Sequence, residues 1–431
     1  MMQWLRPGLQ IKRWLLLLFV GVLLCGLGVA LLLVQLYRQV DFGPGVSGLA
    51  VYVLFLQFVE PEWLRGLILV AISFTVLLGG IVLFNRTLLA PFAKGRSIGE
   101  VVLQRKQLQR GPKVVAIGGG HGLATLLHGL KEQTSNLTAI VTVADDGGSS
   151  GRLRKAFHIP APGDIRNCIV ALADAEPLVQ ELFQYRFGEG NDLEGHSFGN
   201  LFIAALTRIT GNFERALRES SRVLAVRGQI LPSTLEDVRL CAVMADELVV
   251  HGESNIPDSG REIDRVYLEP EHIMAYPEAV AAILDADFIV IGPGSLYTSI
   301  LPNLLIEGIQ QAIRASNAAK VYVCNVATQR GETDGFEVDD HIRALYRHGC
   351  RGMFQHVLAN SEPNAELPSK FAVTSPPRRK HLQVDLSLHL VSSDVVSRKD
   401  ALKHDPERLA GRLMDIYYSR GARQPSRAKA S

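Results

Sequence analysis

Five short runs of apolar, often β-branched residues constrain the fold of this chain more than any other feature of its sequence. The runs cover 113–117, 137–146, 286–292, 320–325 and 355–360. Segments with the apolar spacing of helices, such as 302–315, alternate with them, and this alternation is typical of a mostly parallel sheet covered on both faces. The sequence therefore predicts an α/β fold, with a largely helical insertion over 164–231 and an antiparallel pair of strands over 238–269.

Two longer apolar runs precede the predicted sheet. Residues 14–34 include no charged side chain, and residues 66–84 include only two hydroxyl side chains as polar groups. At a rise of 1.5 Å per residue, each run would form a helix of about 30 Å, which is the thickness of the hydrocarbon layer of a membrane. The sequence therefore predicts transmembrane helices at about 14–36 and 66–84, within a membrane anchor formed by residues 1–95.

The basic residues around these two runs predict their orientation. Lys and Arg lie before the first run and after the second, with few in the loop between them, and such residues stay on the cytoplasmic side. Both termini and the main domain, which follows a linker over 96–111, are therefore expected on the cytoplasmic side of the cell (inner) membrane. A cleaved signal peptide is disfavoured because the first run is too long and lacks a cleavage site. A buried core helix is the other alternative.

Charge is unevenly distributed along the chain. The formal net charge of +2 combines about +7 in residues 1–110 with about −5 in the remainder. A mildly acidic main domain argues against nucleic acid as a partner. The five cysteines include no C-x-x-C pair, so the sequence indicates neither a zinc site nor a disulfide framework.

Glycine-rich turns follow two of the predicted strands, at the carboxyl ends where ligands bind in open α/β sheets. Glycines let the backbone approach a ligand closely, and the helix that follows offers its N-terminal amides to an anion. A tight turn from strand to helix is the alternative interpretation. The candidate ligand-binding residues in these turns are Gly118, Gly119, Gly120, His121 and Gly122 after the first strand, and Gly292, Pro293, Gly294 and Ser295 after 286–292.

An acidic pair, Asp145 and Asp146, ends the second apolar run. Such carboxylates are suited to hold a ribose, to coordinate Mg²⁺ or to orient an attacking hydroxyl, so both are the candidate catalytic and metal-binding residues. Ser149 and Arg152, which follow closely, are suited to contact phosphate oxygens. A solvated turn with a helix cap is the alternative.

Further polar candidates are spread over the rest of the main domain. Asp164 is suited either to bind a ligand or to cap the helix that begins beside it. Asn167, Asn200, Asn325 and Lys403 are the other candidate ligand-binding residues. His121, His196 and His404 are candidate bases, but no spacing selects one of them.

Two other enzyme classes fit parts of the sequence. Residues 195–199 match the G-x-S-x-G nucleophile elbow of serine hydrolases, but no strand precedes them, so helix capping by Ser197 is favoured. Gly118 and Gly120 fit the start of a dinucleotide-binding fingerprint, but Leu123 stands where the third glycine belongs. Both classes are therefore disfavoured.

Long motifs in the main domain resemble the YvcK family of gluconeogenesis factors, within the CofD-like superfamily of 2-phospho-L-lactate transferases. They include VVAIGGGHGLATLLHGLK, IVTVADDGGSSGRLR, PGDIRNCIVALAD, LEGHSFGNLF, GESNI, IGPGSLYTSILPNLL and KVYVCNVATQRGETDGF. The resemblance covers about residues 112–410. It implies a Rossmann-like fold with a helical addition, and a nucleotide-diphosphate ligand such as UDP-N-acetylglucosamine. It also implies roles in gluconeogenic growth, cell-wall synthesis and cell shape.

Carried over by position, the family's nucleotide contacts fall on Gly118–Gly122, Asn200 and Gly292–Ser295, and the acidic pair lines the same cleft. The segment KHDPERLA resembles a family segment that begins Arg-His-Asp, so Lys403 keeps the charge of the arginine but not its two-pronged geometry. His121 stands where many members have Thr. Residues 411–431 are expected to form the end of a helix and a basic tail.

Two hypotheses for the function remain open. The first is a nucleotide-sugar-binding regulator of carbon metabolism and cell-wall synthesis at the membrane, with a homo-oligomeric state and cell-wall or metabolic protein partners expected. The alternative is a transferase that moves a 2-phospholactyl-type group from a nucleoside diphosphate donor, with Mg²⁺ as its expected cofactor.

Overall fold

The computed structural model describes residues 19–30, 62–89, 106–190, 192–361 and 382–421. The chain divides into two compact units, Met1–Lys106 and Gln107–Ser431, and each is described here by itself. The expected linker over 96–111 contains this division.

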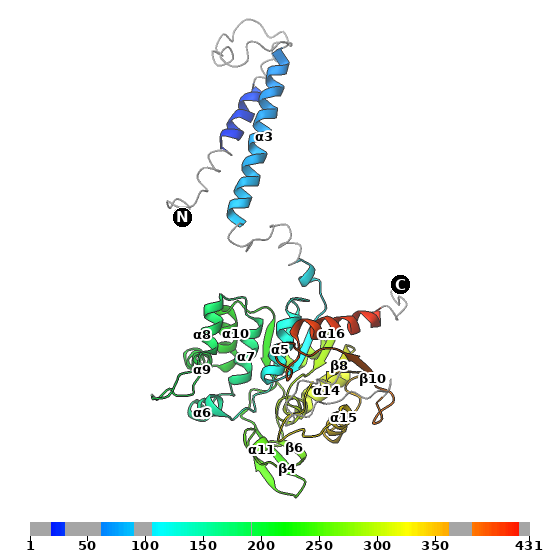
Figure 1. The fold of residues 1–431 in the computed structure, drawn as a ribbon. Helices are drawn as coiled ribbons and strands as arrows, with labels where there is room; N and C mark the ends of the chain where they lie inside the picture. The colour runs from blue at the N-terminus through cyan, green and yellow to red at the C-terminus, as the bar shows by residue number, and fades with distance from the viewer. Residues whose placement is uncertain (1–18, 31–61, 90–105, 191, 362–381, 422–431) are drawn as a thin grey trace. The chain divides into compact units, whose positions relative to one another are not determined.

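In the first unit, residues 19–30 are helical and a second helix, α3, covers Glu62–Leu89 (Figure 1). The two helices approach closely at Gly21, where an added Cβ would lie 3.2 Å from the backbone nitrogen of Leu77. The hydroxyl of Ser73 donates a hydrogen bond to the Gly21 carbonyl. The helix predicted over 66–84 is therefore confirmed as part of α3.

The membrane-spanning role predicted for these helices is not supported. In the described ranges, no helix combines the length and the apolarity that crossing a membrane requires. Only a part of the first expected span, 14–36, lies within these ranges.

The second unit is built on a seven-stranded sheet in which every neighbouring pair of strands is parallel. Its order is β10-β9-β8-β7-β1-β2-β3. The strands are β1 (Val114–Gly118), β2 (Leu137–Val141), β3 (Gln229–Pro232), β7 (Phe288–Ile291), β8 (Ala319–Val323), β9 (His356–Asn360) and β10 (His389–Ser393). The predicted α/β fold with a mostly parallel sheet is thus confirmed.

The strand order places a topological switch point between β1 and β7. From β1 the chain adds β2 and β3 on one side, then returns to build β7 to β10 on the other side. Every residue of β1, β7 and β8 is buried, as expected for strands covered on both faces. Loops that leave the carboxyl ends at a switch point diverge to opposite faces, and the crevice between them is where such folds bind ligands.

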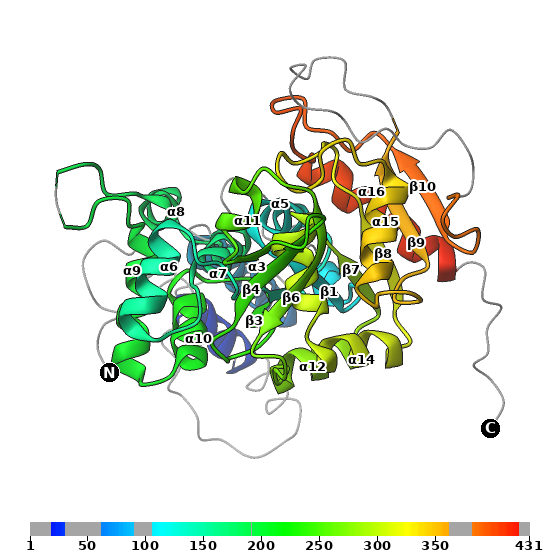
Figure 2. The same cartoon turned by 90° about the horizontal axis from the view of Figure 1, so that it is seen from below.

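Helices cover both faces of this sheet (Figure 2). On one face α5 (Gly120–Leu130) packs against α7 (Gly163–Leu172) and α16 (Pro406–Gly421), and on the other α12 (Pro277–Leu284) packs against α14 (Glu307–Ala315). Further helices of this unit are α6 (Gly148–Phe157), α11 (Asn255–Asp258), α13 (Leu301–Leu304) and α15 (Val338–Arg347), with a π-helical turn at Leu296–Ile300.

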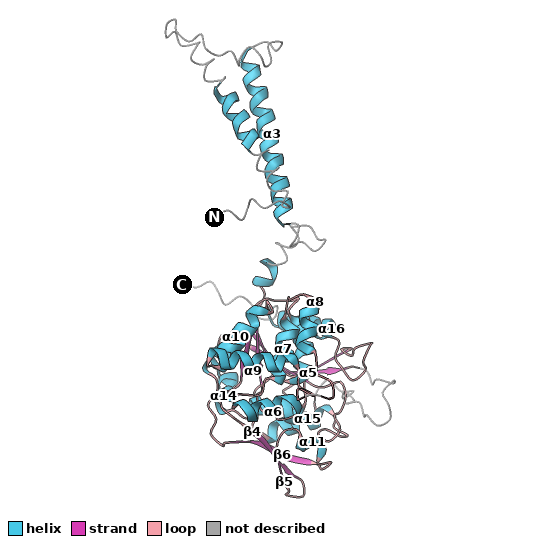
Figure 3. Ribbon diagram, turned by 90° about the vertical axis from the view of Figure 1, so that its left-hand side faces the viewer, coloured by secondary structure: helices cyan, strands magenta, loops and turns pink. Residues whose placement is uncertain are grey.

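The helical insertion and the antiparallel strands also match the prediction. Between α7 and β3 lie α8 (Pro177–Gln184), α9 (Phe198–Thr210) and α10 (Phe213–Val223). A separate antiparallel sheet in the order β5-β4-β6 contains β4 (Arg239–Met244), β5 (Val249–His251) and β6 (Ile263–Glu269), and Figure 3 shows these strands together. This sheet has one strand more than the expected pair.

Candidate functional site

A cavity of about 630 Å³ opens at the carboxyl ends of β1, β7 and β8. The two glycine turns after β1 and β7 form part of its wall. The loop that follows β8 and the segment just before α16 contribute further lining residues. The cavity therefore lies at the switch point of the sheet, where the sequence placed its main candidates.

Two positions in the first glycine turn have no room for a side chain. A Cβ on Gly119 would lie 2.4 Å from the Oδ2 atom of Asp164, and a Cβ on Gly122 would lie 2.7 Å from the Pro293 carbonyl oxygen. Gly120 has a φ of +61°, a conformation that favours glycine. Helix α5 begins here without a side-chain cap. Its first turn thus presents backbone amides and a positive dipole end to the cavity.

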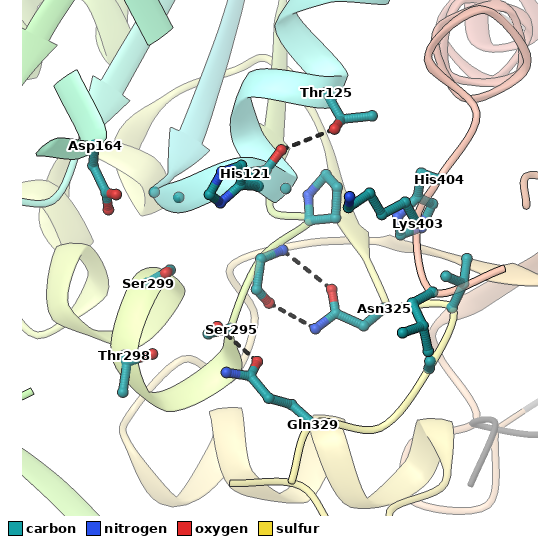
Figure 4. A pocket seen from close by; sticks show the side chains of 18 of the residues that line it. His121, Thr125, Asp164, Ser295, Thr298, Ser299, Asn325, Gln329, Lys403 and His404 are labelled. Carbon is teal, nitrogen blue, oxygen red and sulfur yellow. Dashed lines mark hydrogen bonds between the residues drawn. The ribbon is translucent and has the colours of Figure 1, made fainter. Parts of the chain in front are cut away.

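The second glycine turn is held by Asn325. This side chain accepts a hydrogen bond from the Gly294 amide at 3.1 Å, and its Nδ2 atom donates to the Gly294 carbonyl at 2.8 Å (Figure 4). Beside it, the hydroxyl of Ser295 donates to the Oε1 atom of Gln329 at 2.6 Å. Asn325 lines the cavity as predicted, but both ends of its amide support the turn.

Carboxyl groups form an acidic wall of the cavity. Asp145, Asp164 and Glu253 line it, and Glu332 is buried behind Thr298, whose hydroxyl donates to it at 3.0 Å. Burial, followed by the charge of Asp145, raises the pKa of Asp164 to about 7 and that of Glu253 to about 8. Burial also raises the pKa of Asp145, and it raises that of Glu332 to about 7. Near neutral pH these carboxyls are therefore partly protonated and partly ionised.

The two members of the predicted acidic pair have different surroundings. Asp145 lines the cavity, with its Oδ1 atom accepting from the Gly147 amide at 3.0 Å. Asp146 instead accepts hydrogen bonds at 2.9 Å from both the amide and the hydroxyl of Ser254, and it is not among the lining residues. The two neighbouring carboxylates therefore differ in role, because the side chain of Asp146 is held by Ser254 and that of Asp145 lines the cavity.

Several other predicted residues lie outside the lining of this cavity. Ser149 sits within 3.0 Å of the Nδ1 atom of His196 and accepts from the Nδ2 atom of Asn200 at 3.2 Å. The set outside the lining consists of Gly118, Gly292, Asp146, Ser149, Arg152, Asn167 and Asn200. Arg152 donates to the Glu194 carbonyl at 2.5 Å, and Asn167 accepts from Arg166 at 2.8 Å.

Ser197 has the capping role that was favoured over a nucleophile. Its hydroxyl accepts a hydrogen bond from the Asn200 amide at 3.3 Å and so caps α9. Among the described residues before it, the segment makes an isolated bridge, Arg186 with Ser197, and not the buried strand that a nucleophile elbow requires.

The segment before α16 closes the opposite side of the cavity. Lys403 lines it, is half exposed, and pairs with Asp400 at 2.8 Å. His404 is buried beside it and one ring nitrogen bonds the backbone of Cys324, while the Nε2 atom has no partner among the described residues. Burial lowers the pKa of His404 to about 4, so the ring is neutral at physiological pH. A neutral ring that donates through its other nitrogen leaves Nε2 as a hydrogen-bond acceptor.

Some lining residues were not among the predicted candidates. Glu253, Thr298, Ser299, Gln329 and Arg330 also line the cavity. Glu253 lies in the motif GESNI, and Gln329 and Arg330 lie in KVYVCNVATQRGETDGF. These motifs carried the family resemblance, so they held a signal. Nothing local in them distinguishes a lining residue from its neighbours.

Comparisons with known proteins agree with this architecture. The family model described as 2-phospho-L-lactate transferase CofD matches residues 114–396. The gluconeogenesis factor of Bacillus subtilis is 50% identical over 313 aligned positions, which cover 71% of this chain and 98% of that protein. A Nostoc sp. relative with a gluconeogenesis factor name is 46% identical over 434 positions, covering 96% of this chain and 92% of its own.

A solved structure supports the same assignment. The crystal structure of a Bacillus halodurans protein is 47% identical to this chain and superposes with a TM-score of 0.68, covering 71% of this chain and 100% of the other. The family match extends over more than half of the chain and contains both glycine turns and the acidic wall. The chain therefore belongs to the CofD family, and its curated relatives are gluconeogenesis factors.

Proposed function

We propose that the cavity binds a nucleotide-sugar of the UDP-N-acetylglucosamine class and that the protein acts as a ligand-dependent regulator. The observation that carries this proposal is the contact between the two glycine turns. Gly122 and Pro293 approach so closely that not even a Cβ fits between them, which places backbone from both sides of the switch point at one end of the cavity. Backbone of this kind suits a diphosphate.

The remaining lining suits the other parts of such a ligand. Lys403 and Arg330 supply positive charge beside the glycine turns. The carboxyls of Asp164 and Glu253 and the hydroxyls of Thr298 and Ser299 are hydrogen-bonding partners for the hydroxyls of a sugar. Carboxyls that hold protons near pH 7 also reduce the repulsion that an acidic wall would exert on a diphosphate.

The biological role in this proposal follows from the relatives. Proteins that cover most of this chain at 46–50% identity carry the name gluconeogenesis factor. A protein that binds a cell-wall precursor nucleotide-sugar and affects gluconeogenic growth would couple precursor supply to carbon metabolism, cell-wall synthesis and cell shape.

Mg²⁺ would accompany a diphosphate ligand. It is usually held by one or two carboxylates together with phosphate oxygens and water. Asp145 faces the cavity and has this chemistry, whereas both hydrogen bonds to Asp146 come from Ser254. Asp145 is therefore the member of the acidic pair that we assign to the metal.

Calorimetric titration of the full chain with UDP-N-acetylglucosamine tests this proposal, with GDP and NAD as competitors. We expect saturable binding of the UDP-sugar that weakens about tenfold in Lys403→Ala, because one charged contact contributes ~1.5 kcal/mol. Lys155→Ala removes an exposed lysine outside the cavity and should bind as the parent does. Equal binding by both variants would contradict the proposed place of the diphosphate, and preference for NAD would contradict the ligand class.

A transferase is the second candidate, and the acidic wall favours it. In that reaction an acceptor hydroxyl would attack the outer phosphorus of a nucleoside diphosphate donor, the bridging P–O bond would break, and nucleoside monophosphate would leave. The hydroxyl proton would pass to Asp164, because a pKa of about 7 leaves a large fraction of this carboxyl ionised at neutral pH. Guanine-nucleotide preference with release of nucleoside monophosphate would establish this candidate, whereas UDP-sugar binding without turnover supports the regulator.

A further inference from the structure

Outside the cavity, one face of the small antiparallel sheet carries a group of metal-ligating side chains. The Sγ atom of Cys241 lies 3.2 Å from the Nδ1 atom of His251, which in turn lies 3.7 Å from the Oε2 atom of Glu269. Within the described part of the chain, this is the one group of three Cys, His, Asp or Glu side chains whose ligand atoms all lie within 4.8 Å of one another.

The register of the sheet explains why these residues meet. Cys241 on β4 is directly opposite His251 on β5 and opposite Tyr267 on β6, and Glu269 lies two residues beyond Tyr267 on the same face. The alternate residues of β4, such as Leu240 and Ala242, are fully buried in the core. Three hydrogen-bonded strands thus present one ligand each, from a face that does not build the core.

We propose that Cys241, His251 and Glu269 form a binding site for a divalent transition metal of the zinc class. Bonds of 2.3 Å to sulfur and about 2.1 Å to nitrogen and oxygen, arranged tetrahedrally, separate neighbouring ligand atoms by about 3.4–3.6 Å. The observed separations of 3.2 and 3.7 Å need shifts of only a few tenths of an ångström to reach these values. A thiolate and an imidazole select this class over Mg²⁺ or Ca²⁺.

The degree of exposure suits a metal from solution. The Cys241 side chain is buried, whereas His251 and Glu269 are 52% and 41% exposed and leave a path from solvent. Metal binding replaces the thiol proton, which passes to solvent. The Tyr267 hydroxyl, which bonds the Cys241 side chain, or a water molecule completes a fourth position. The ligands come from three strands without a C-x-x-C pair, so no sequence motif marks the site.

The position of the site gives it a structural role. Its ligand His251 ends β5, an edge strand of three residues, and the chain then continues through Gly252 to Glu253 and Ser254. Glu253 lines the ligand cavity, and Ser254 holds Asp146. A metal that joins β5 to β4 and β6 therefore fixes the segment that carries Glu253. The site does not depend on which ligand occupies the cavity.

Titration of the metal-free full chain with Co²⁺ alone tests the inference, because a cobalt–thiolate bond has its own near-ultraviolet absorption. We expect one Co²⁺ per chain with this absorption, displaced by Zn²⁺, and a thermal midpoint that rises with added Zn²⁺. Cys241→Ser should abolish the absorption. His251→Asn and Glu269→Gln should weaken binding at least tenfold, because even indirect partners of a metal contribute 10–100-fold.

His272→Ala, which removes an exposed histidine outside the group, is the matched control and should bind as the parent does. Absence of the thiolate absorption in the parent chain would overturn the inference, as would its persistence in Cys241→Ser. If Cys241→Ser fails to fold, His251→Asn decides the matter, because that side chain is half exposed and its replacement leaves the core intact. Unchanged cobalt affinity in folded His251→Asn would also overturn the inference.

Discussion

Three of the glycines predicted after the first strand, Gly119, Gly120 and Gly122, line the cavity, as the sequence predicted for that turn. A Cβ on Gly119 or Gly122 would lie within 2.7 Å of another residue, so a side chain at either position cannot be accommodated without a shift. A run of glycines directly after a buried strand indicates a turn of this kind. A local pattern does not predict where a carboxylate points. Asp146, for example, is held by Ser254, more than a hundred residues away in the sequence. Long-range partners of this kind are set by the tertiary fold.

The titration of Asp164 leads to a prediction about stability and pH. Its pKa rises from 3.8 to about 7 in the folded chain, so the folded state holds this proton more tightly than the unfolded state. The resulting stabilisation is complete below pH 4 and is lost as pH rises through 7. Asp164→Asn mimics the protonated form. We expect the variant to be ~1–2 kcal/mol more stable than the parent at pH 8, after screening by water in the cavity.

Urea unfolding of both proteins at pH 5 and pH 8 measures this effect. The gain should shrink toward pH 5, where the parent is protonated as well. Asp258→Asn, at an exposed position at the end of α11, should follow the pH dependence of the parent. A stability difference between Asp164→Asn and the parent that does not change with pH would show that burial does not raise this pKa.

Asn325 leads to a second prediction at this scale. Asn325→Ala removes both hydrogen bonds that hold Gly294, at a cost of ~1–2 kcal/mol in the free energy of unfolding. The freed turn should also bind the UDP-sugar about tenfold more weakly, because it must be ordered on binding. Asn325→Asp keeps the acceptor for the Gly294 amide and loses only the donor, so its affinity should be intermediate. Calorimetry and thermal unfolding measure both effects. Unchanged affinity in Asn325→Ala would mean that the turn is rigid without this side chain.

Among the elements, the sequence predicted the central strands and missed those at the edges. The buried strands β1, β7 and β8 are continuous apolar runs, which is a strong local signal. The two edge strands are β3, with the sequence QILP, and β10, with HLVSS. In β3 buried residues alternate with exposed or half-buried ones, and in β10 every residue is exposed or half-buried. An edge strand needs fewer apolar residues, so its signal resembles that of a loop. The predicted ends of strands were also imprecise, because the apolar run 137–146 was expected to be a strand and β2 ends at Val141.

Helix α9 provides a prediction at the scale of an element. Ser197 caps this helix by accepting a hydrogen bond from the Asn200 amide, so Ser197→Ala should lower the free energy of unfolding by ~1 kcal/mol. Asn212 caps α10 through the Arg215 amide in the same way, and Asn212→Ala is the matched comparison with a similar expected loss. Thermal unfolding of the two variants measures both. UDP-sugar affinity should not change in Ser197→Ala, because Ser197 does not line the cavity. Reduced affinity would indicate that the helical insertion contributes to the site.

At the scale of the whole molecule, the order of the strands creates the site. Gly118 and Gly292 lie 174 residues apart in sequence, yet β1 and β7 are neighbours, so their turns face one another. The sequence indicated that both turns would lie at carboxyl ends of strands, because parallel strands share that edge. It did not indicate that the two strands would be adjacent. The resemblance to a known family implied that both turns contact one nucleotide, but it did not state which strands pair, and local patterns contain no information on strand pairing.

We expect the second unit, Gln107–Ser431, to fold and to bind its ligand without the first unit. The B. subtilis relative and the solved B. halodurans structure are matched almost completely by 71% of this chain, so the shared fold is complete in chains of that length. The Nostoc match covers 96% of this chain, which must include most of the unit Met1–Lys106. This first unit is thus an addition that some relatives share.

We expect residues 107–431 alone to unfold cooperatively and to bind the UDP-sugar within about twofold of the full chain, because the described lining of the cavity belongs to that unit. Parallel calorimetry and thermal unfolding of the two chains measure this. Loss of affinity in a truncated chain that still unfolds cooperatively would show that the first unit shapes the cavity, and loss of cooperative unfolding would show that the two units fold as one.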